Sequence, residues 1–305
     1  MSATQDLTAR IRELAGIRKA IVLAHNYESP EVQDAADYVG DSLGLSRTAA
    51  KTSAQVIVFC GVHFMAETAA ILSPGKTVLL PDINAGCPMA NMLSARQLRN
   101  FRAEHPAAQV ITYVNSTAEV KALSDICCTS ANAVAVVDSF PRDQELIFAP
   151  DRNLGDYICK KLGRPMHLWN GFCPTHERIL PELIHQARAA HPQAELLVHP
   201  ECRPEVVALA DFVGSTTGIL KHCKDSTRQE FIIATESGVL HSLNKDNPGK
   251  KFYPASPIAD CPNMKLITLE KIIWALEDMA PEVRVPAEIA ERARLPIEKM
   301  LKITG

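Results

Sequence analysis

The chain has 305 residues, of which 47% are apolar and 22% are charged, and its formal net charge is −3. This composition is typical of a globular protein, and the slight negative charge argues against nucleic acid or an anionic membrane surface as a partner. No apolar run approaches the roughly 20 residues that span a bilayer. Because the start of the chain lacks the apolar core of a secretory signal, we expect a cytoplasmic protein without a membrane partner.

Apolar runs that resemble β-strands alternate with helical stretches along the whole chain. The runs are short, rich in β-branched residues and apolar on both faces, which is typical of parallel strands covered by helices on both sides. The pattern predicts strands at residues 20–25, 55–60, 77–82, 109–114, 133–138, 145–150, 166–170, 195–200, 230–235 and 251–255. It predicts helices at residues 45–54, 64–73, 118–124, 153–163, 175–192 and 203–210. The predicted fold class is therefore α/β.

The dipeptide Cys-Pro occurs three times at nearly constant spacing. Its cysteines stand in steps of 86 and 88 residues and are Cys87, Cys173 and Cys261. Three strand ends recur in steps of 88 and 86 residues, at His25, Tyr113 and His199. A hydroxyl residue follows each strand end after 17 residues, at Ser42, Ser130 and Thr216. A fixed period of this kind indicates repeated structural units.

The repeat predicts three homologous three-layer αβα units with parallel sheets around a pseudo-threefold axis. We place the first unit at residues 1–86 plus 262–305, with the terminal helices, the second at 87–172 and the third at 173–261. Ligands of parallel α/β sheets bind at the carboxyl ends of the strands. The strand-end residues and the three Cys-Pro cysteines should therefore meet at one central point.

Three thiolates at one point favour an iron–sulfur cluster, because soft sulfur ligands select such clusters. Disulfides and structural zinc are weaker alternatives. The nine cysteines are an odd, scattered set rather than a disulfide framework, and the sequence contains no C-x₂-C pair of the kind that binds structural zinc. Three protein ligands on four irons leave one iron open as a Lewis acid, which indicates dehydration chemistry. Cys127 and Cys128 lie in a strand-like segment and are predicted to be core. No role is assigned to Cys60, Cys159, Cys202 and Cys223.

At these motifs the sequence resembles the quinolinate synthase family. The matching stretches run from residue 24 to residue 265 and are AHNY, GDS, PDINAGCPMA, TYVNS, TSAN, GFCPTHE, VHPEC, GSTTGI and DCPNMK. The resemblance implies an enzyme of NAD biosynthesis with one [4Fe–4S] cluster per chain and three αβα units. It implies condensation of iminoaspartate (iminosuccinate) with dihydroxyacetone phosphate to quinolinate, with release of phosphate and two waters. It leaves open a transient contact with L-aspartate oxidase.

The resemblance also assigns roles to residues by position. The cluster ligands would be Cys87, Cys173 and Cys261. The residues that contact the substrates would be His25, Ser42, Tyr113, Asn115, Ser130, His199, Glu201 and Thr216. The acid–base groups would be Tyr27, His199 and Glu201. Some members carry C-x₂-C-x₂-C at the last ligand, but Ala255 and Ile258 stand at the two upstream positions here, so we expect no disulfide switch.

Three hydroxyl residues could bind the anionic substrates, since the assigned residues include no Lys or Arg. Ser42, Ser130 and Thr216 each follow a strand and open a predicted helix, whose free N–H groups and dipole suit phosphate and carboxylate. The alternative is that each one only caps its own helix.

The remaining assigned side chains also have structural alternatives. His25 and His199 could be core histidines, but both precede polar turns, which favours a pocket. Glu201 is either half of a salt bridge or a base with a raised pKa, and we favour the base. Tyr27 and Tyr113 either donate to a developing oxyanion or only pack.

Two other functions fit the same motifs. One is a different iron–sulfur hydro-lyase that acts on a small hydroxy acid. The other is a non-catalytic iron–sulfur sensor, which should carry a basic or partner-binding surface. The sequence shows no basic stretch of that kind, and its polar residues gather at strand ends instead.

Overall fold

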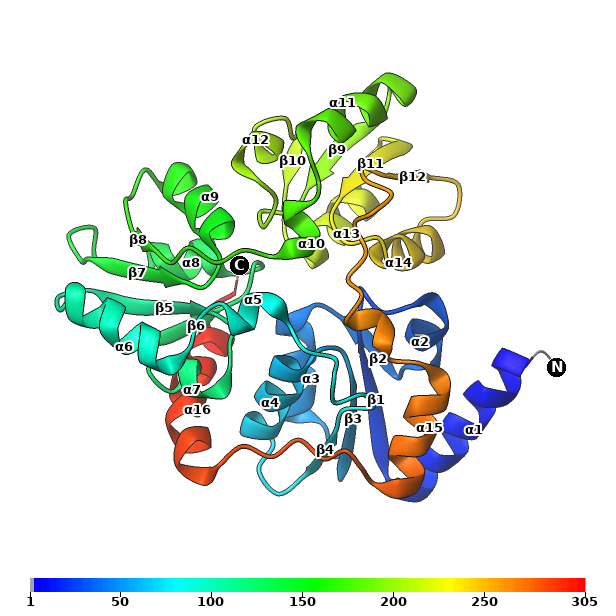
Figure 1. Cartoon of the computed structure of the whole chain (residues 1–305). Helices are drawn as coiled ribbons and strands as arrows, with labels where there is room; N and C mark the ends of the chain where they lie inside the picture. The colour runs from blue at the N-terminus through cyan, green and yellow to red at the C-terminus, as the bar shows by residue number, and fades with distance from the viewer. Residues whose placement is uncertain (1–2, 305) are drawn as a thin grey trace.

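The computed structural model describes residues 3–304 and has three lobes, each built on a four-stranded parallel sheet (Figure 1). We call them the first, second and third unit. The strand orders are equivalent in the three units: β2-β1-β3-β4, β6-β5-β7-β8 and β10-β9-β11-β12. Every strand pair within the sheets is parallel. The predicted fold class, three αβα units with parallel sheets, is confirmed.

The strands are short, as their apolar runs indicated. Their bounds are β1 Ala20–His25, β2 Tyr38–Gly40, β3 Val56–Cys60, β4 Thr77–Leu79, β5 Gln109–Tyr113, β6 Ile126–Cys128, β7 Leu146–Ala149, β8 His167–Leu168, β9 Glu195–Val198, β10 Phe212–Val213, β11 Glu230–Ala234 and β12 Lys251–Pro254. The helices are α1 Ala3–Arg18, α2 Pro30–Ala35, α3 Ser42–Lys51, α4 His63–Leu72, α5 Pro88–Asn91, α6 Ala95–Glu104, α7 Ala118–Lys121, α8 Ala133–Asp138, α9 Arg152–Leu162, α10 Pro174–Glu177, α11 Pro181–Ala190, α12 Pro204–Val207, α13 Thr216–Asp225, α14 Val239–Asp246, the 3₁₀ helix η1 Met264–Leu266, α15 Leu269–Asp278 and α16 Ala287–Lys302.

The first sheet lies between two pairs of helices, with α1 and α15 on one face and α3 and α4 on the other (Figure 1). The last helix, α16, packs against α4 of the first unit and against β6 and α7 of the second. The C-terminal segment therefore joins two units. The residue boundaries of the three units stay a prediction.

One aspartate recurs in every unit and closes the same turn of the chain. Its Oδ2 accepts a hydrogen bond of 2.8 Å from the backbone N–H that stands 15 residues earlier, in the first strand of the unit. The three donor–acceptor pairs are Val22 with Asp37, Val110 with Asp125, and Leu196 with Asp211. The aspartates stand in steps of 88 and 86 residues, so they support the repeat with residues that played no part in finding it.

A cationic side chain also recurs in the same steps of 88 and 86 residues, and the sequence analysis missed it. Arg164 is buried, and Lys76 and Lys250 are half-buried. Lys76 donates to the Thr52 carbonyl, and Lys250 donates to the carbonyls of Cys223 and Ser226 at 2.5 and 2.7 Å. Arg164 donates to four carbonyls of residues 137–144 at 2.6–3.0 Å. Each cation satisfies carbonyls at or after a helix C-terminus, where positive charge is favourable.

Two expectations about secondary structure were wrong. The run at 133–138, predicted to be a strand, is helix α8, in which Ala133, Val136 and Val137 are buried at helical spacing. A short apolar run does not distinguish a strand from a buried helix by its periodicity. The helix predicted at 175–192 is two helices, because Leu180 is extended and Pro181 cannot continue the preceding turn.

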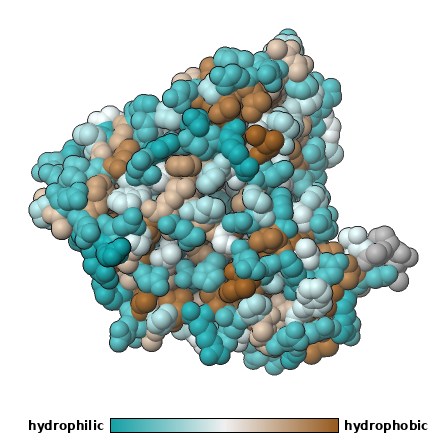
Figure 2. Space-filling view, in the orientation of Figure 1, coloured by the Kyte–Doolittle hydropathy of each residue, from teal (hydrophilic) through white to brown (hydrophobic). Residues whose placement is uncertain are grey.

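On the face drawn in Figure 2, hydrophilic residues predominate and hydrophobic ones lie in separate groups. The most exposed large apolar side chains, such as Trp274 and Leu295, belong to different helices. Within residues 3–304, none of the helices combines the length and the apolar character that crossing a bilayer requires.

Candidate active site

The three units meet around a cavity of about 450 Å³. Its wall includes all twelve side chains to which the sequence analysis assigned a role. They are His25, Tyr27, Ser42, Cys87, Tyr113, Asn115, Ser130, Cys173, His199, Glu201, Thr216 and Cys261. The parallel sheets bring them together because each one follows a strand at its carboxyl end or stands in a loop on that side.

The three Cys-Pro cysteines hold equivalent positions at the start of a helical turn. Cys87 is the residue before α5 and Cys173 the residue before α10, while Cys261 precedes the turn that leads into η1. In each case the cysteine carbonyl accepts a backbone N–H from the fourth residue along, at 2.9–3.3 Å. All nine cysteines are free thiols. Cys127 and Cys128 are buried in β6, as predicted.

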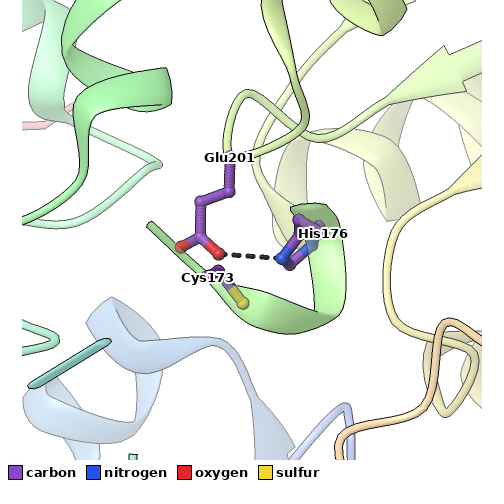
Figure 3. A group of neighbouring side chains, drawn as sticks. All are labelled: Cys173, His176 and Glu201. Atoms are coloured by element: carbon purple, nitrogen blue, oxygen red, sulfur yellow. Dashed lines mark ion pairs between the residues drawn. The ribbon is translucent and has the colours of Figure 1, made fainter. Parts of the chain in front are cut away.

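Several potential metal-ligand atoms line the cavity. Within residues 3–304, one trio of potential ligand atoms lies within 4.8 Å of one another, and it comprises Cys173, His176 and Glu201 (Figure 3). Cys87 and Cys261 are outside this trio but line the same cavity. Within residues 3–304, the three Cys-Pro cysteines therefore do not form such a trio by themselves. Burial raises the pKa of Cys87 to about 12, so a bound cation would be needed to make it a thiolate.

His25 and His199 make the same local contact in two different units. The Nδ1 atom of each ring accepts the backbone N–H of the residue two positions on, at 3.2 Å from Tyr27 and 3.3 Å from Glu201. Burial lowers the pKa of both histidines to about 3, so the rings are neutral. With Nδ1 occupied as an acceptor, the proton is assigned to Nε2, which becomes a donor. In His199 this Nε2 lies 3.2 Å from the Ser130 hydroxyl.

Glu201 is a buried carboxylate with a partner on each oxygen. Tyr113 donates its hydroxyl to Oε1, and Nδ1 of His176 lies 2.9 Å from Oε2 (Figure 3). Burial alone would raise the pKa of Glu201, but His176, His199 and Tyr113 together lower it below its usual range. The expected rise in pKa is therefore wrong, because the sequence did not reveal these neighbours. Glu201 is ionised and can accept a proton.

A chain of contacts connects Glu201 to Tyr27 across the site. His176 Nε2 lies 2.8 Å from the Thr235 hydroxyl, which lies 2.8 Å from the Tyr27 hydroxyl. The Tyr27 hydroxyl in turn lies 2.9 Å from the Thr216 hydroxyl. One direction suits these contacts: Tyr27 donates to Thr235, and Thr235 donates to His176 Nε2, which places the ring proton on Nδ1, facing Glu201. The contact of Nδ1 with Glu201 is an ion pair at 2.9 Å without the alignment of a hydrogen bond.

The sequence analysis gave no role to His176 or Thr235. His176 stands three residues after Cys173 in the quoted stretch GFCPTHE, a spacing that puts both on one face of the turn. Thr235 directly follows β11, at the carboxyl end of the strand, where site residues were expected. Both signals were therefore present in the sequence.

Two of the three hydroxyl residues open helices, and neither is the cap. Ser42 and Thr216 are the first residues of α3 and α13, and the caps are Asp41 and Ser215, which accept N–H groups three residues on at 2.9 and 3.1 Å. The capping alternative is thus wrong for Ser42 and Thr216, whose hydroxyls lie on the cavity wall. Ser130 does not open a helix, because α8 begins three residues later.

The wall also contains groups that the motifs did not indicate. Arg178 and Arg203 are on it, but both guanidinium groups are held by backbone or by Glu177: Arg178 donates to the Asp260 carbonyl at 2.9 Å and Arg203 to the Glu177 carbonyl at 2.8 Å. The buried Oδ1 of Asn115 has no hydrogen-bond partner within residues 3–304. It is an acceptor available to a ligand.

Comparison with known proteins agrees with the motif-based resemblance. A family model described as quinolinate synthetase A protein matches residues 9–302. A quinolinate synthase of Desulforudis audaxviator (strain MP104C) is 55% identical over 303 residues, which cover 99% of this chain and 100% of its own. A quinolinate synthase of Geotalea uraniireducens (strain Rf4) is 54% identical over 298 residues, which cover 98% of each chain. These matches confirm the resemblance drawn from the sequence.

Proposed function

The chain belongs to the quinolinate synthetase A protein family and is an enzyme, and on that premise we propose that its cavity condenses iminoaspartate with dihydroxyacetone phosphate. The products are quinolinate, phosphate and two waters, as the resemblance implied. The observation that carries the proposal is the path from Glu201 to Tyr27, an ion pair with His176 followed by hydrogen bonds through Thr235, because condensation and ring closure need protons removed and delivered at several atoms of one small molecule.

Neutral donors would hold the anionic groups of the substrates. The free N–H groups at the starts of α3 and α13, together with Ser42 and Thr216, suit the phosphate and a carboxylate. The Nε2–H groups of His25 and His199 would donate to a carboxylate. The open Oδ1 of Asn115 would accept an N–H from the nitrogen of iminoaspartate.

Glu201 would act as the base that takes a proton from the bound substrate. Tyr27 would deliver its own proton to an oxygen at the other end of the molecule. To restore both groups, each donor between them would reverse: Glu201 would give its proton to His176 Nδ1, His176 would give one from Nε2 to Thr235, and Thr235 would give one to Tyr27. Burial raises the pKa of Tyr27 well above its usual value, so the phenol stays protonated and able to donate. Tyr113 would keep Glu201 oriented toward the cavity.

Cys87, Cys173 and Cys261 would hold one [4Fe–4S] cluster per chain. Their equivalent positions at the starts of helical turns on one cavity support this ligand set. Cys202, a conceivable fourth ligand, is buried off the wall with its thiol on the Ala234 carbonyl at 3.4 Å. The cluster would therefore supply an iron without a protein ligand, a Lewis acid for loss of water.

In the cell, we expect the enzyme to work in the cytoplasm as a step of NAD biosynthesis. Iminoaspartate would be supplied by oxidation of aspartate, which makes a transient contact with L-aspartate oxidase part of the proposal.

Product analysis tests the function directly. Protein purified without oxygen should convert iminoaspartate and dihydroxyacetone phosphate to quinolinate, detected by mass, with one phosphate released for each turnover. A hydro-lyase of another kind would make no quinolinate but would dehydrate a small hydroxy acid. A sensor would carry the cluster, seen by absorbance near 400 nm, and would turn over neither.

A further inference from the structure

A buried acidic residue on the cavity wall, Glu236, accepts hydrogen bonds from three groups of the protein itself. It follows β11 and is fully buried. Its Oε1 accepts the backbone N–H of Cys261 at 3.0 Å and lies 3.0 Å from Lys265 Nζ, while its Oε2 accepts the N–H of Gly238 at 2.7 Å. Bonds to an ionised acceptor are stronger than neutral ones, so this carboxylate orients the Cys261 peptide.

Lys265 extends the contact from Glu236 in the third unit to Tyr27 in the first unit. Its ammonium donates to the Tyr27 carbonyl as well as pairing with Glu236. Its own backbone N–H donates to the Cys261 carbonyl at 3.3 Å, so Lys265 and Cys261 belong to the same turn. The two chain segments are also in close contact, because a Cβ on Gly238 would lie 2.8 Å from the carbonyl carbon and oxygen of Tyr27.

The loop around Cys261 is bonded to the loops of both other cysteines. Asn263 donates its side-chain amide to the carbonyl of Gly86, the residue before Cys87, at 2.6 Å. Arg178, which follows the α10 turn that Cys173 opens, donates to the Asp260 carbonyl at 2.9 Å. The position of the 260–265 loop therefore determines how the three cysteines stand relative to one another.

We propose that Glu236 is a positioning residue which, with Lys265, fixes the third cluster cysteine and the acid–base residue Tyr27 in one arrangement. This inference rests on the proposed function. Residues that orient metal ligands typically change metal affinity or activity by about 10–100-fold when they are replaced. Burying an ionised carboxylate is costly, and here it is offset by three donors that all belong to the site's framework.

Iron release measures this role without relying on turnover. Protein carrying its full iron complement would be mixed anaerobically with a strong iron chelator, and the loss of absorbance near 400 nm would be followed in wild type, Glu236→Ala and Glu236→Gln. We expect release about tenfold faster in Glu236→Ala. Glu236→Gln should lie between it and wild type, because the amide oxygen still accepts the Cys261 N–H.

Gln33→Met is the matched control. Gln33 is buried at the same contact between the first and third units, where its amide donates to the carbonyls of Asn26, Glu28 and Gly238 at 2.9–3.1 Å. It bonds to neither Cys261 nor Lys265. We expect a lower melting temperature in Gln33→Met but iron release close to that of wild type.

The outcomes separate this inference from the function it rests on. If Glu236→Ala and Glu236→Gln release iron at the wild-type rate, or no faster than Gln33→Met at an equal loss of melting temperature, Glu236 has only a structural role. If Glu236→Ala does not fold, Glu236→Gln decides alone. If wild type itself holds no iron, the proposed cluster fails, and that result is visible before any variant is compared.

Discussion

The interiors of the three units and the cavity between them follow opposite rules. Inside the units, residues at one repeat position keep their chemistry: an aspartate closes the same turn three times, and a Lys or Arg satisfies helix carbonyls three times. At the cavity, some repeat positions differ in chemistry, as in the set Tyr27, Asn115 and Glu201, which stand in steps of 88 and 86 residues. A threefold framework thus supports a site in which each unit supplies a different group.

Two cavity sets keep their chemistry in all three units: the hydroxyl residues Ser42, Ser130 and Thr216, and the three Cys-Pro cysteines, which are identical. The proposed cluster would account for the identical cysteines, because it would present equivalent irons to equivalent ligands. The comparison therefore separates residues that a symmetric cofactor would require from residues that an asymmetric substrate would require.

The largest effect should come from the cysteines. Cys173→Ser should abolish cluster assembly and activity, because a hydroxyl is a hard, poorly ionised substitute for a thiolate. Cys128→Ala, a buried cysteine off the cavity wall, should keep near-normal iron. Iron and sulfide analysis after anaerobic reconstitution measures both. Full iron content in Cys173→Ser would rule out the ligand set.

Glu201→Gln should cost about 10²–10⁴-fold in turnover while iron content stays normal, since the amide cannot accept a proton. The same substitution also removes the ion pair with His176, so the melting temperature should be recorded beside the rate. A drop in melting temperature with turnover intact would show that Glu201 has a structural role. The difference between Tyr27, Asn115 and Glu201 at one repeat position would then not reflect catalysis.

Arg164→Met tests whether a repeated position carries equal weight in each unit. It should destabilise the protein by about 3 kcal/mol, because it strips four carbonyls of their donor in a site where the guanidinium is buried. Lys76→Met and Lys250→Met should each cost about 1 kcal/mol, since these cations satisfy fewer carbonyls. Urea unfolding gives the three values, and equal costs would contradict the structural difference.

The smallest effect concerns Glu28, a fully buried residue at the contact between units whose carboxyl oxygens have no hydrogen-bond partner within residues 3–304. Burial raises its pKa well above the usual value. The folded state therefore favours the neutral acid, and stability should be lost as pH rises from about 4.3, the pKa in the unfolded chain, through the raised folded pKa.

Glu28→Gln removes this dependence because it is neutral at every pH. Glu28→Gln and wild type should have nearly equal melting temperatures at pH 4. The melting temperature of Glu28→Gln should exceed that of wild type increasingly toward pH 8, where its free energy of unfolding should be higher by about 1 kcal/mol. Thermal melts in a series of buffers provide the comparison. A difference that does not change with pH would mean that Glu28 is already ionised or paired at pH 4.

Much of the framework could be predicted, because it rests on local pattern. Short apolar runs of β-branched residues indicated parallel strands, and the Cys-Pro spacing indicated three units. The failures were also local. The apolar run at 133–138 fits either a strand or a buried helix, and it is a helix. The helical pattern at 175–192 contains Pro181, which starts a second helix there. Two edge strands, β2 and β10, are only two or three residues long and gave little signal of their own.

By itself, the sequence determined the family, the three-unit α/β fold and the set of side chains that share the cavity, since chemistry and spacing along the chain are enough to recognise a repeat and a motif. Only the tertiary structure decided how those side chains act on one another. Glu201 is ionised because His176 and Tyr113 reach it, and Tyr27 is linked to it because Thr235 stands between. Proton affinity depends on distance and burial in three dimensions, and contacts between residues far apart in the chain set both.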